Sequence, residues 1–317
     1  MPTSTSITTT YSGEFKDQII AASLLSAPTI EAGGITIKPN IKYKEIIKRL
    51  STDDILKNAT CDFDATSTIT LTERVLTPEE FQVNLQLCKK DFHSDYLSAQ
   101  QGFSSFDTLP TSFQDFLVAH VAAKVAAKNE TNIWSGVTAN AGEFDGFATL
   151  LAADAALPSA QEVAGTTVTA ANVIAEMGKI VDAIPAALYG QEDLYIYVSQ
   201  NMARAYVRAL GGFGASGLGA NGTNSLGTQW YNNGSLSFDG VKVFVANGLA
   251  ANKAIATTKD NLYFGTSLMS DMTEVKVIDL ADIDGSQNVR VVMRLSAGVQ
   301  YGVVQDIVTY GITNSAN

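Results

Sequence analysis

The chain has 317 residues, of which 46% are hydrophobic and only 17% are charged, and its formal net charge is −11 at pH 7. This length can bury a large core and predicts more than one lobe. An acidic chain disfavours a protein that grips DNA through its phosphates, although it is compatible with enclosing nucleic acid without adhering to it. A surface with so few charges also favours an oligomer over a monomer.

The cysteines and the first residues indicate the compartment. Cys61 and Cys88 are the only cysteines and form no C-x-x-C pair, so free thiols in a reducing compartment are favoured over a disulfide. The segment Met1–Thr10 lacks the cationic start and apolar stretch of a signal peptide. No run approaches the ~18 apolar residues that a membrane span needs. We therefore expect synthesis and first function in a cytoplasm.

Residues 1–76 are predicted to have little regular structure by themselves. Residues 1–35 are rich in Ser and Thr and then in Gly, Ala and Pro, which predicts a loose tail or an arm that orders against a neighbour. Residues 35–76 have a mixed polar pattern. They contain one basic cluster, which is read either as a solvated face or as a charged loop reaching an acidic neighbouring subunit: Lys38, Lys42, Lys44, Lys48 and Arg49.

A strand and two helices are predicted next. Strict alternation over Phe81–Cys88 predicts a strand with its apolar side chains on one face. Residues 89–101 are expected to form a short helix. A longer helix is expected over 112–134, because Ser112 to Asp115 approximates a capping box and apolar residues follow at i+4 spacing.

The centre of the chain alternates helices and strands. A helix over 170–184, capped by Thr169 and stopped by Pro185, is followed by a buried strand over 194–198. Ser199 is expected to cap the next helix, which ends at Gly211. Residues 211–234 then hold eight glycines in 24 positions, before a strand resumes over 241–245.

The last third is predicted to be strands. Short strands begin at Asn261 and cover 274–280, an acidic turn follows at 282–286, and a long apolar run over 289–310 has the β-branched alternation of a half-buried hairpin. Nothing in this segment supplies a nucleophile, a ligand cluster or a phosphate loop.

No pattern predicts an active site. The segment Gly212–Gly217 matches G-x-G-x-x-G, but it follows a helix rather than a strand, so a turning loop is favoured over nucleotide binding. Asp282–Gly285 resembles the start of a calcium loop without its required glutamate. The remaining candidates lack catalytic partners: His93, His120, and the acidic pair Asp62 and Asp64. We expect no enzyme, no cofactor and no metal, and hence no catalytic, cofactor-binding or metal-binding residue.

The order of these elements resembles the major capsid proteins of tailed bacteriophages, which share the HK97-type fold. The resemblance covers about residues 30 to 312. It is carried by the passage Phe81–Leu97, the helix Ser112–Trp134, the glycine turn within Asn132–Phe147, the unit Leu194–Leu210 with its glycine-rich loop, and Asn261–Asp271 with the terminal hairpin.

The resemblance implies an α+β fold with four parts. These are an N-terminal arm at 1–34, an extended loop (E-loop) at 35–80, a peripheral P-domain at 81–150 and 261–317 with its spine helix at 112–134 and a β-hairpin, and an axial A-domain at 151–260. It further implies self-assembly into hexamers and pentamers of an icosahedral head around double-stranded DNA. Such a protein is located in the virion and assembled in the host bacterial cytoplasm.

The implied partners are other copies of the chain, a portal, decoration proteins and scaffolding. Members with a fused scaffold carry a charged helical segment before the arm, whereas this chain starts directly with the arm, so scaffolding is expected to be separate, absent or already removed. No lysine and asparagine pair is identified for a crosslink. Two alternatives remain open: an encapsulin-like compartment, which shares the fold but encloses a cargo enzyme, and a surface or adhesion protein, which the Thr/Ser/Gly/Asn-rich composition suggests although no signal peptide or repeat supports it.

Overall fold

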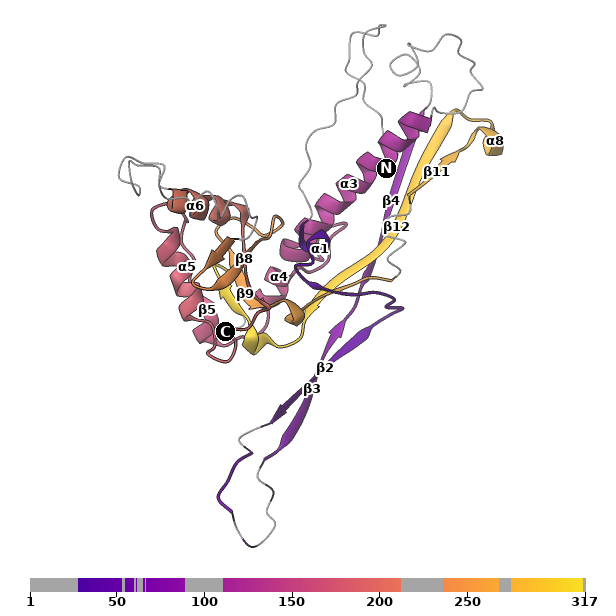
Figure 1. The fold of residues 1–317 in the computed structure, drawn as a ribbon. Helices are drawn as coiled ribbons and strands as arrows, with labels where there is room; N and C mark the ends of the chain where they lie inside the picture. Colours follow the sequence, from indigo (N-terminus) through magenta and orange to yellow (C-terminus); the bar gives the residue numbers. More distant parts are fainter. Residues whose placement is uncertain are drawn as a thin grey trace.

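The computed structural model describes residues 28–52, 55–59, 61, 65, 67–88, 111–211, 236–267 and 275–315. They form an elongated limb, a mixed α/β lobe beside one end of it, and a hairpin that projects from the limb (Figure 1). The mixed helix and sheet composition predicted from the sequence is confirmed. The expected helix at 89–101 lies outside the described residues.

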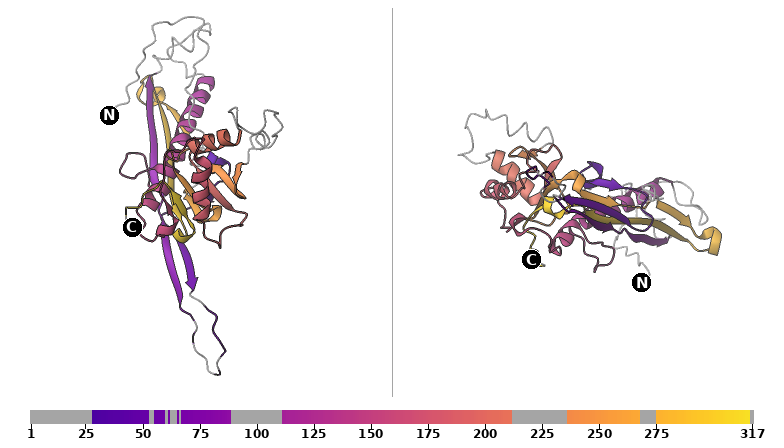
Figure 2. Two further views of the ribbon diagram at one scale, coloured as in Figure 1. Left: turned by 90° about the vertical axis from the view of Figure 1, so that its left-hand side faces the viewer. Right: turned by 90° about the horizontal axis from the view of Figure 1, so that it is seen from below.

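The limb consists of one long helix along two long strands and one short strand. Helix α3 (Thr111–Ser135) has 25 residues and confirms the predicted long helix. Strand β12 (Asn288–Tyr301) pairs antiparallel with β4 (Glu79–Cys88) and with β11 (Val275–Asp279). Because β4 and β11 pair with the same residues of β12, β12 is the central strand of this ribbon. Figure 2 shows the helix lying along the ribbon for most of its length.

The predicted alternation of β4 is confirmed by its register. Phe81, Val83, Leu85 and Leu87 are half-buried, and the residues between them are exposed. Their partners on β12 alternate in the same phase, with buried Val291 and Met293 between exposed Arg290 and Arg294. One face of the ribbon is therefore apolar and the opposite face is polar, as the period of a strand requires.

The acidic turn predicted at 282–286 connects β11 to β12. It contains the single helical turn α8 (Ala281–Asp284) and ends at Gly285 in the left-handed conformation with φ 69°. Toward the other end of β12, β10 (Leu262–Gly265) pairs antiparallel with it, and β1 (Thr36–Lys38) pairs parallel with β10. Helix α1 (Pro28–Glu31) precedes β1.

The lobe contains a six-stranded sheet in the order β5-β13-β9-β6-β8-β7. Its strands are β5 (Glu162–Val163), β6 (Leu194–Val198), β7 (Leu236–Phe238), β8 (Val241–Val245), β9 (Ala254–Thr258) and β13 (Val308–Tyr310). The sequence predicted β6 and β8 at these positions. Short helical segments complete the lobe and its junction with the limb: α4 (Phe147–Ala152), η1 (Ser159–Gln161), η2 (Lys259–Asn261) and η4 (Val304–Asp306).

The two faces of this sheet belong to two different cores. Helices α5 (Val173–Asp182) and α6 (Gln200–Gly211) cover one face and pack on Ile196, Val243 and Ala256. Tyr197 and Ile255 point to the other face, where they join Trp134 and Phe147 in a core that continues into the limb. Trp134 and Tyr197 have their ring centroids 5.1 Å apart. The end of α3 is therefore packed directly against the lobe.

Two predicted features differ in the structure. The run 289–310 is not one hairpin, because β12 ends at Tyr301 and β13 joins the six-stranded sheet, where it pairs with β9 and β5. The apolar alternation did not reveal this break, which η4 produces. The helix expected from residue 170 begins at Val173, since Thr169 is held by the Asn172 side chain, which accepts hydrogen bonds from its backbone and its hydroxyl.

The second hairpin was not predicted. Residues 35–76 were interpreted as a long polar loop, but β2 (Glu45–Thr52) and β3 (Ile69–Leu76) form a two-stranded antiparallel sheet. Apolar residues are interspersed with charged and hydroxyl-bearing ones in both strands, without the strict alternation of β4, so the strand pattern was not recognised. This hairpin projects away from both the limb and the lobe (Figure 1).

Candidate assembly surfaces

The projecting hairpin has an apolar outer face. The register places Ile46 opposite Val75 and Leu50 opposite Leu71, and directly opposed residues of an antiparallel pair share one face of the sheet. Exposure is 49% for Ile46, 63% for Leu50, 69% for Ile69, 64% for Leu71 and 40% for Val75. Clustered exposed apolar side chains mark interaction sites in soluble proteins. These five side chains are called the outer face below.

The hairpin also lacks strand neighbours. Strands β2 and β3 pair only with each other in the described part of the chain, so both edges of the hairpin are open. A two-stranded sheet by itself is at most marginally stable in water. Its open edges and its outer face together present a surface that another chain can cover.

The opposite face of the hairpin is fixed to the body of the molecule. The Arg74 guanidinium on β3 donates a hydrogen bond to the Asp154 carboxylate beyond α4 and lies over the Tyr301 ring, 4.4 Å from its centroid. The Tyr301 hydroxyl donates to the same Asp154 oxygen at 2.6 Å. Arg49 of β2 donates to the Gln305 side chain. Leu76, at the root, is fully buried.

The electrostatics of this contact favour an ionised Asp154. Its partial burial raises the pKa, but hydrogen bonds from the Tyr301 hydroxyl, the Ala156 backbone N–H and Arg74 outweigh burial and leave the pKa below its usual value. Burial and donation to Asp154 raise the pKa of Tyr301, so that its hydroxyl remains a donor. Asp154 thus joins β3, α4 and β12 at one point.

A second buried polar cluster lies where the arm meets α3. Thr29 of α1 donates to the Glu130 carboxylate from its hydroxyl at 2.6 Å and from its backbone N–H at 3.2 Å. The Trp134 indole N–H donates to the Thr29 hydroxyl at 2.8 Å. Glu130 is 1% exposed, and burial raises its pKa even though hydrogen bonds from Thr29 and Gly248 lower it. Helix α1 is therefore attached to the long helix α3.

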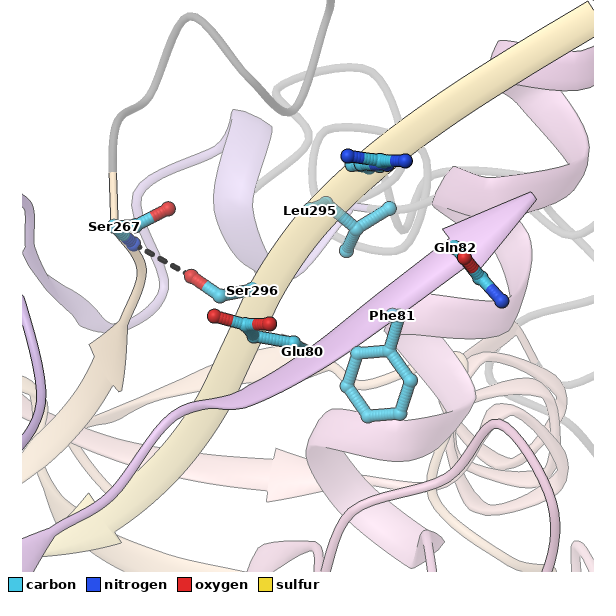
Figure 3. Close-up of a pocket in the computed structure, with 7 residues that line it drawn as sticks. Glu80, Phe81, Gln82, Ser267, Leu295 and Ser296 are labelled. Atoms are coloured by element: carbon cyan, nitrogen blue, oxygen red, sulfur yellow. Dashed lines mark hydrogen bonds between the residues drawn. The ribbon is translucent and has the colours of Figure 1, made fainter.

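A pocket of about 530 Å³ lies along the polar side of the limb (Figure 3). Its exposed polar side chains are Glu80 and Gln82 of β4 and Arg294 of β12. The Ser267 backbone N–H donates to the Ser296 hydroxyl at 2.8 Å and closes one side. Phe81 and Leu295 complete the lining. Neither Glu80 nor Arg294 has an ion-pair partner among the residues that the structure describes.

The structure does not bring together the residues that were considered as candidates for catalysis or metal binding. His120 is half-buried on α3, Cys61 is exposed and Cys88 is half-buried, and both thiols are free. His93, Asp62, Asp64 and Gly212–Gly217 lie outside the described residues. Within the described ranges no group of three or more His, Cys, Asp or Glu is placed to hold a metal ion. None of the described helices is both long and apolar enough to cross a membrane.

The basic cluster at 38–49 divides between two roles. Lys38 forms an ion pair with Glu45, and Arg49 binds Gln305, so these two cations are used within the chain. Lys48 is exposed on the hairpin beside the outer face. Lys42 and Lys44 are exposed as well, which agrees with a solvated face, and the reading of a loop that reaches a neighbouring subunit stays a prediction.

Sequence reasoning missed the residues that build these surfaces. Glu130 sits in a polar stretch, Asn129–Asn132, directly before Ile133 and Trp134; Asn129, Glu130 and Asn132 are buried as well, which their polar side chains did not indicate. For Arg74, Asp154 and Tyr301 no local signal exists, because three separate segments contribute them.

Comparison with known proteins shows similarity in structure. No family model and no curated protein sequence matches the chain. The capsid of a native GTA particle superposes with a TM-score of 0.63 at 14% identity, covering 95% of each chain. The capsid of Myoviridae phage XM1 gives 0.58 at 12% identity, covering 94% of this chain and 96% of that one.

The capsid of the cyanophage P-SCSP1u gives a TM-score of 0.56 at 13% identity, covering 96% of this chain and 93% of that one. The similarity thus extends over nearly the whole chain in each case, including the limb, the lobe and the hairpin. The resemblance drawn from the order of sequence elements is confirmed at the level of the fold. The chain has the α+β fold of phage capsid proteins.

Proposed function

We propose that this chain is the major shell subunit of a phage-type capsid. It assembles into hexamers and pentamers that close an icosahedral head around double-stranded DNA, and its role is structural rather than enzymatic. The observation that carries the proposal is the projecting hairpin, whose outer face is open to solvent in the isolated chain although it is apolar. A surface of this kind is stable in solution when another subunit covers it.

The architecture supports the parts of this role. The limb and the lobe share the core around Trp134, which makes a rigid body, while the hairpin extends away from it. A closed shell needs such a body together with an element that reaches a neighbour. A net charge of −11 disfavours strong adhesion to packaged DNA.

The remaining assignments belong to the same proposal. Residues 1–34 form the arm, 35–80 the extended loop, 81–150 with 261–317 the peripheral domain and 151–260 the axial domain, with the strand Val308–Tyr310 crossing into the axial sheet. A separate scaffold, a portal and decoration proteins are its partners, and the assembled protein is located in the virion after assembly in the host bacterial cytoplasm.

The test is assembly of the expressed protein, with and without the scaffold protein encoded beside it. Electron microscopy and light scattering are expected to show closed shells or free hexamers and pentamers. Nuclease-protected DNA in particles from infected or induced cells supports a phage head, whereas a packaged enzyme indicates a compartment. A chain that stays monomeric under both conditions overturns the proposal.

A double variant tests whether the apolar outer face of the hairpin is needed for assembly. Leu50→Ser with Leu71→Ser is expected to prevent assembly while the free energy of unfolding changes by less than about 0.5 kcal/mol, because both side chains are exposed. Ile174→Ser on α5 is the matched control, since Ile174 is 52% exposed. Normal shells from the double variant would show that the hairpin does not carry assembly.

A further inference from the structure

Each strand of the projecting hairpin is anchored to the body of the molecule through one arginine. Arg49 of β2 donates a hydrogen bond to the side chain of Gln305 in η4. Arg74 of β3 donates to the carboxylate of Asp154, two residues beyond α4. Gln305 and Asp154 belong to segments far apart in the chain, so packing between those segments has to hold the two anchors in place.

The residues that follow β13 bind the segment that carries Asp154. The Asn314 side-chain amide donates to the Asp154 backbone carbonyl at 2.8 Å. The Ser315 backbone N–H donates to the Ala152 carbonyl at 2.9 Å, and the Ser315 hydroxyl donates to the same oxygen at 3.2 Å. Ile312 and Asn314 are 3% and 6% exposed. Residues 312–315, called the clasp below, therefore fix the backbone that presents the Asp154 carboxylate to the hairpin.

The clasp also connects to the second anchor. The Asn314 backbone N–H donates to the Glu162 carboxylate at 2.8 Å. Glu162 is the first residue of β5 and directly follows Gln161, whose side-chain amide donates to the Gln305 backbone carbonyl at 2.6 Å. Gln161 is 7% exposed, so this contact is shielded from water. Asn314 therefore lies between the segment that binds Arg74 and the segment that binds Arg49.

These contacts form a closed circuit. Arg49 lies opposite Thr72 and Ile47 lies opposite Arg74, so the two arginines are diagonal neighbours on one face of the hairpin. From β2 to β3 the circuit passes through Arg49, Gln305, Gln161, Glu162, Asn314, Asp154 and Arg74. A rod attached at one point can turn about that point, whereas two attachments fix its direction. The circuit therefore restrains the direction in which the hairpin projects.

The apolar contact at the base of the hairpin does not set that direction. Leu76 is fully buried there, and its side chain lies against Gly265, where an added Cβ would approach it to 2.8 Å. The hydrophobic effect is non-directional, so this burial holds the base of the hairpin without fixing its angle. Hydrogen bonds depend on both distance and angle. The polar circuit is therefore the part of the base that can define an orientation.

We propose that residues 312–315 are an internal clasp that sets the direction of the hairpin, with Asn314 as the positioning residue between the two arginine anchors. The clasp goes beyond the proposed function and does not depend on it, because every contact in the circuit lies within one chain. The hairpin is thus oriented before any partner binds, and a surface that is already ordered costs less to immobilise on association.

The direction of the hairpin can be measured with two spin labels on the monomeric chain. Thr70→Cys on β3 and Ala175→Cys on α5 provide exposed labelling sites, in a background where Cys61 and Cys88 are changed to serine. Double electron–electron resonance then gives the distribution of distances between the hairpin and the lobe. The wild-type clasp is expected to give one narrow distribution, which corresponds to a hairpin held in one direction.

Removing the Asn314 amide is expected to release the hairpin. Asn314→Ala should raise the ratio of displaced to docked hairpins by about fivefold, the effect of losing one buried hydrogen bond between neutral groups. Thr313→Ala is the matched control, because Thr313 is the exposed neighbour of Asn314 and should leave the distribution unchanged. Thermal unfolding of each variant checks that the chain remains folded at the temperature of the measurement.

Glu162 gives a second and independent pair of variants. Glu162→Ala removes the acceptor of the Asn314 backbone N–H and is expected to displace the hairpin as Asn314→Ala does. Glu162→Gln keeps an acceptor oxygen at this position and is expected to retain the narrow distribution. Rescue by the amide would show that the hydrogen bond, rather than the negative charge of Glu162, positions the clasp.

Combining the clasp variant with loss of both anchors tests the route of the effect. In an Arg49→Gln, Arg74→Gln background, adding Asn314→Ala is expected to change nothing further, because the clasp acts through those anchors. The same fivefold increase in that background, a narrow distribution in Asn314→Ala, or a broad distribution in the wild type would each overturn the clasp. None of these results bears on the shell role, which assembly tests separately.

Discussion

Thr29 and Glu130 are 101 positions apart in the chain, yet the Thr29 hydroxyl donates to the Glu130 carboxylate at 2.6 Å in a fully buried site. Thr29 lies in α1 and Glu130 lies near the end of α3, which packs against the lobe. One hydrogen bond therefore connects the beginning of the described chain to the helix that joins limb and lobe.

The burial of Glu130 gives stability a definite dependence on pH. Its pKa is raised above 4.5 in the folded protein, because burial outweighs the hydrogen bonds from Thr29. A raised pKa contributes stability below the unfolded value and loses it as the pH rises through the folded pKa. The wild type is expected to lose stability relative to Glu130→Gln by at most about 1.4 kcal/mol per pH unit above pH 4.5.

Chemical unfolding of the wild type and Glu130→Gln between pH 4 and about pH 9 measures this difference. The amide keeps the size of the side chain and an acceptor for Thr29, so the variant is expected to fold. A difference in unfolding free energy that stays constant with pH, or that changes in the opposite direction, would contradict the assignment of Glu130 as the buried titrating group.

Removing the Thr29 hydroxyl is expected to lower the free energy of unfolding more than removing the charge of Glu130 does. Thr29→Val keeps the shape of the side chain and the backbone N–H bond to Glu130, but it removes the hydroxyl that donates to the Glu130 carboxylate and leaves the Trp134 indole N–H without its buried acceptor. Unsatisfied buried groups cost about 1–3 kcal/mol. Thr29→Ser, which keeps the hydroxyl, is the matched control and is expected to lose less than half as much. If urea unfolding gives the same loss of unfolding free energy for Thr29→Val and Thr29→Ser, the hydroxyl is not responsible for the loss.

The Asp154 contact is expected to hold the hairpin in place. Asp154→Asn removes the charge that Arg74 and Tyr301 share, and hydrogen bonds to charged groups contribute about 1.5–3 kcal/mol. Hydrogen exchange in β2 and β3 is therefore expected to accelerate, with little change in β6 or β9. Breaking the exposed Lys128–Glu143 pair with Lys128→Gln is the control. Unchanged exchange in the hairpin would mean that Leu76 and its neighbours fix the root without this contact.

The same contact should weaken in acid. The pKa of Asp154 is lowered in the folded protein, since hydrogen bonds from Tyr301, Ala156 and Arg74 outweigh its burial. A lowered pKa contributes stability above the unfolded value that is lost as the pH falls through the folded pKa. Hairpin exchange in the wild type is expected to approach that of Asp154→Asn below about pH 4, after correction for intrinsic exchange. A wild-type hairpin that remains protected there would contradict this.

Gly248 is expected to tolerate no side chain. A Cβ at this position would overlap the Glu130 backbone carbonyl oxygen and approach the Thr131 Cα to 2.8 Å. Helix backbone cannot move as a flexible side chain does, so Gly248→Ala is expected to destabilise by about 3 kcal/mol or more. A Cβ on Gly178 inside α5 would meet no atom within 4 Å, so Gly178→Ala is expected to stabilise by about 0.5–1 kcal/mol. Thermal unfolding of both variants gives the comparison, and similar effects would contradict the close approach.

Periodic patterns in the sequence predicted the elements whose burial is one-sided. The strand β4 and the helix α3 were predicted close to their observed bounds because apolar side chains recur with the period of the element, whereas β6 and β8, whose sheet packs on both faces, were predicted from short apolar runs. The order of these elements was enough to indicate the fold that the phage capsid structures share. The hairpin β2–β3 was missed because its exposed apolar side chains are interspersed with charged and hydroxyl-bearing residues and do not alternate strictly.

Tertiary structure decided where the candidate assembly surfaces lie. The sequence by itself determined the α+β class, the long helix and the absence of a recognisable catalytic motif, since these depend on local period and composition. It did not show that Arg74, Asp154 and Tyr301 meet, or that Thr29 reaches Glu130. Such contacts join segments far apart in the chain. Packing between elements, rather than the pattern within any one of them, selects those partners.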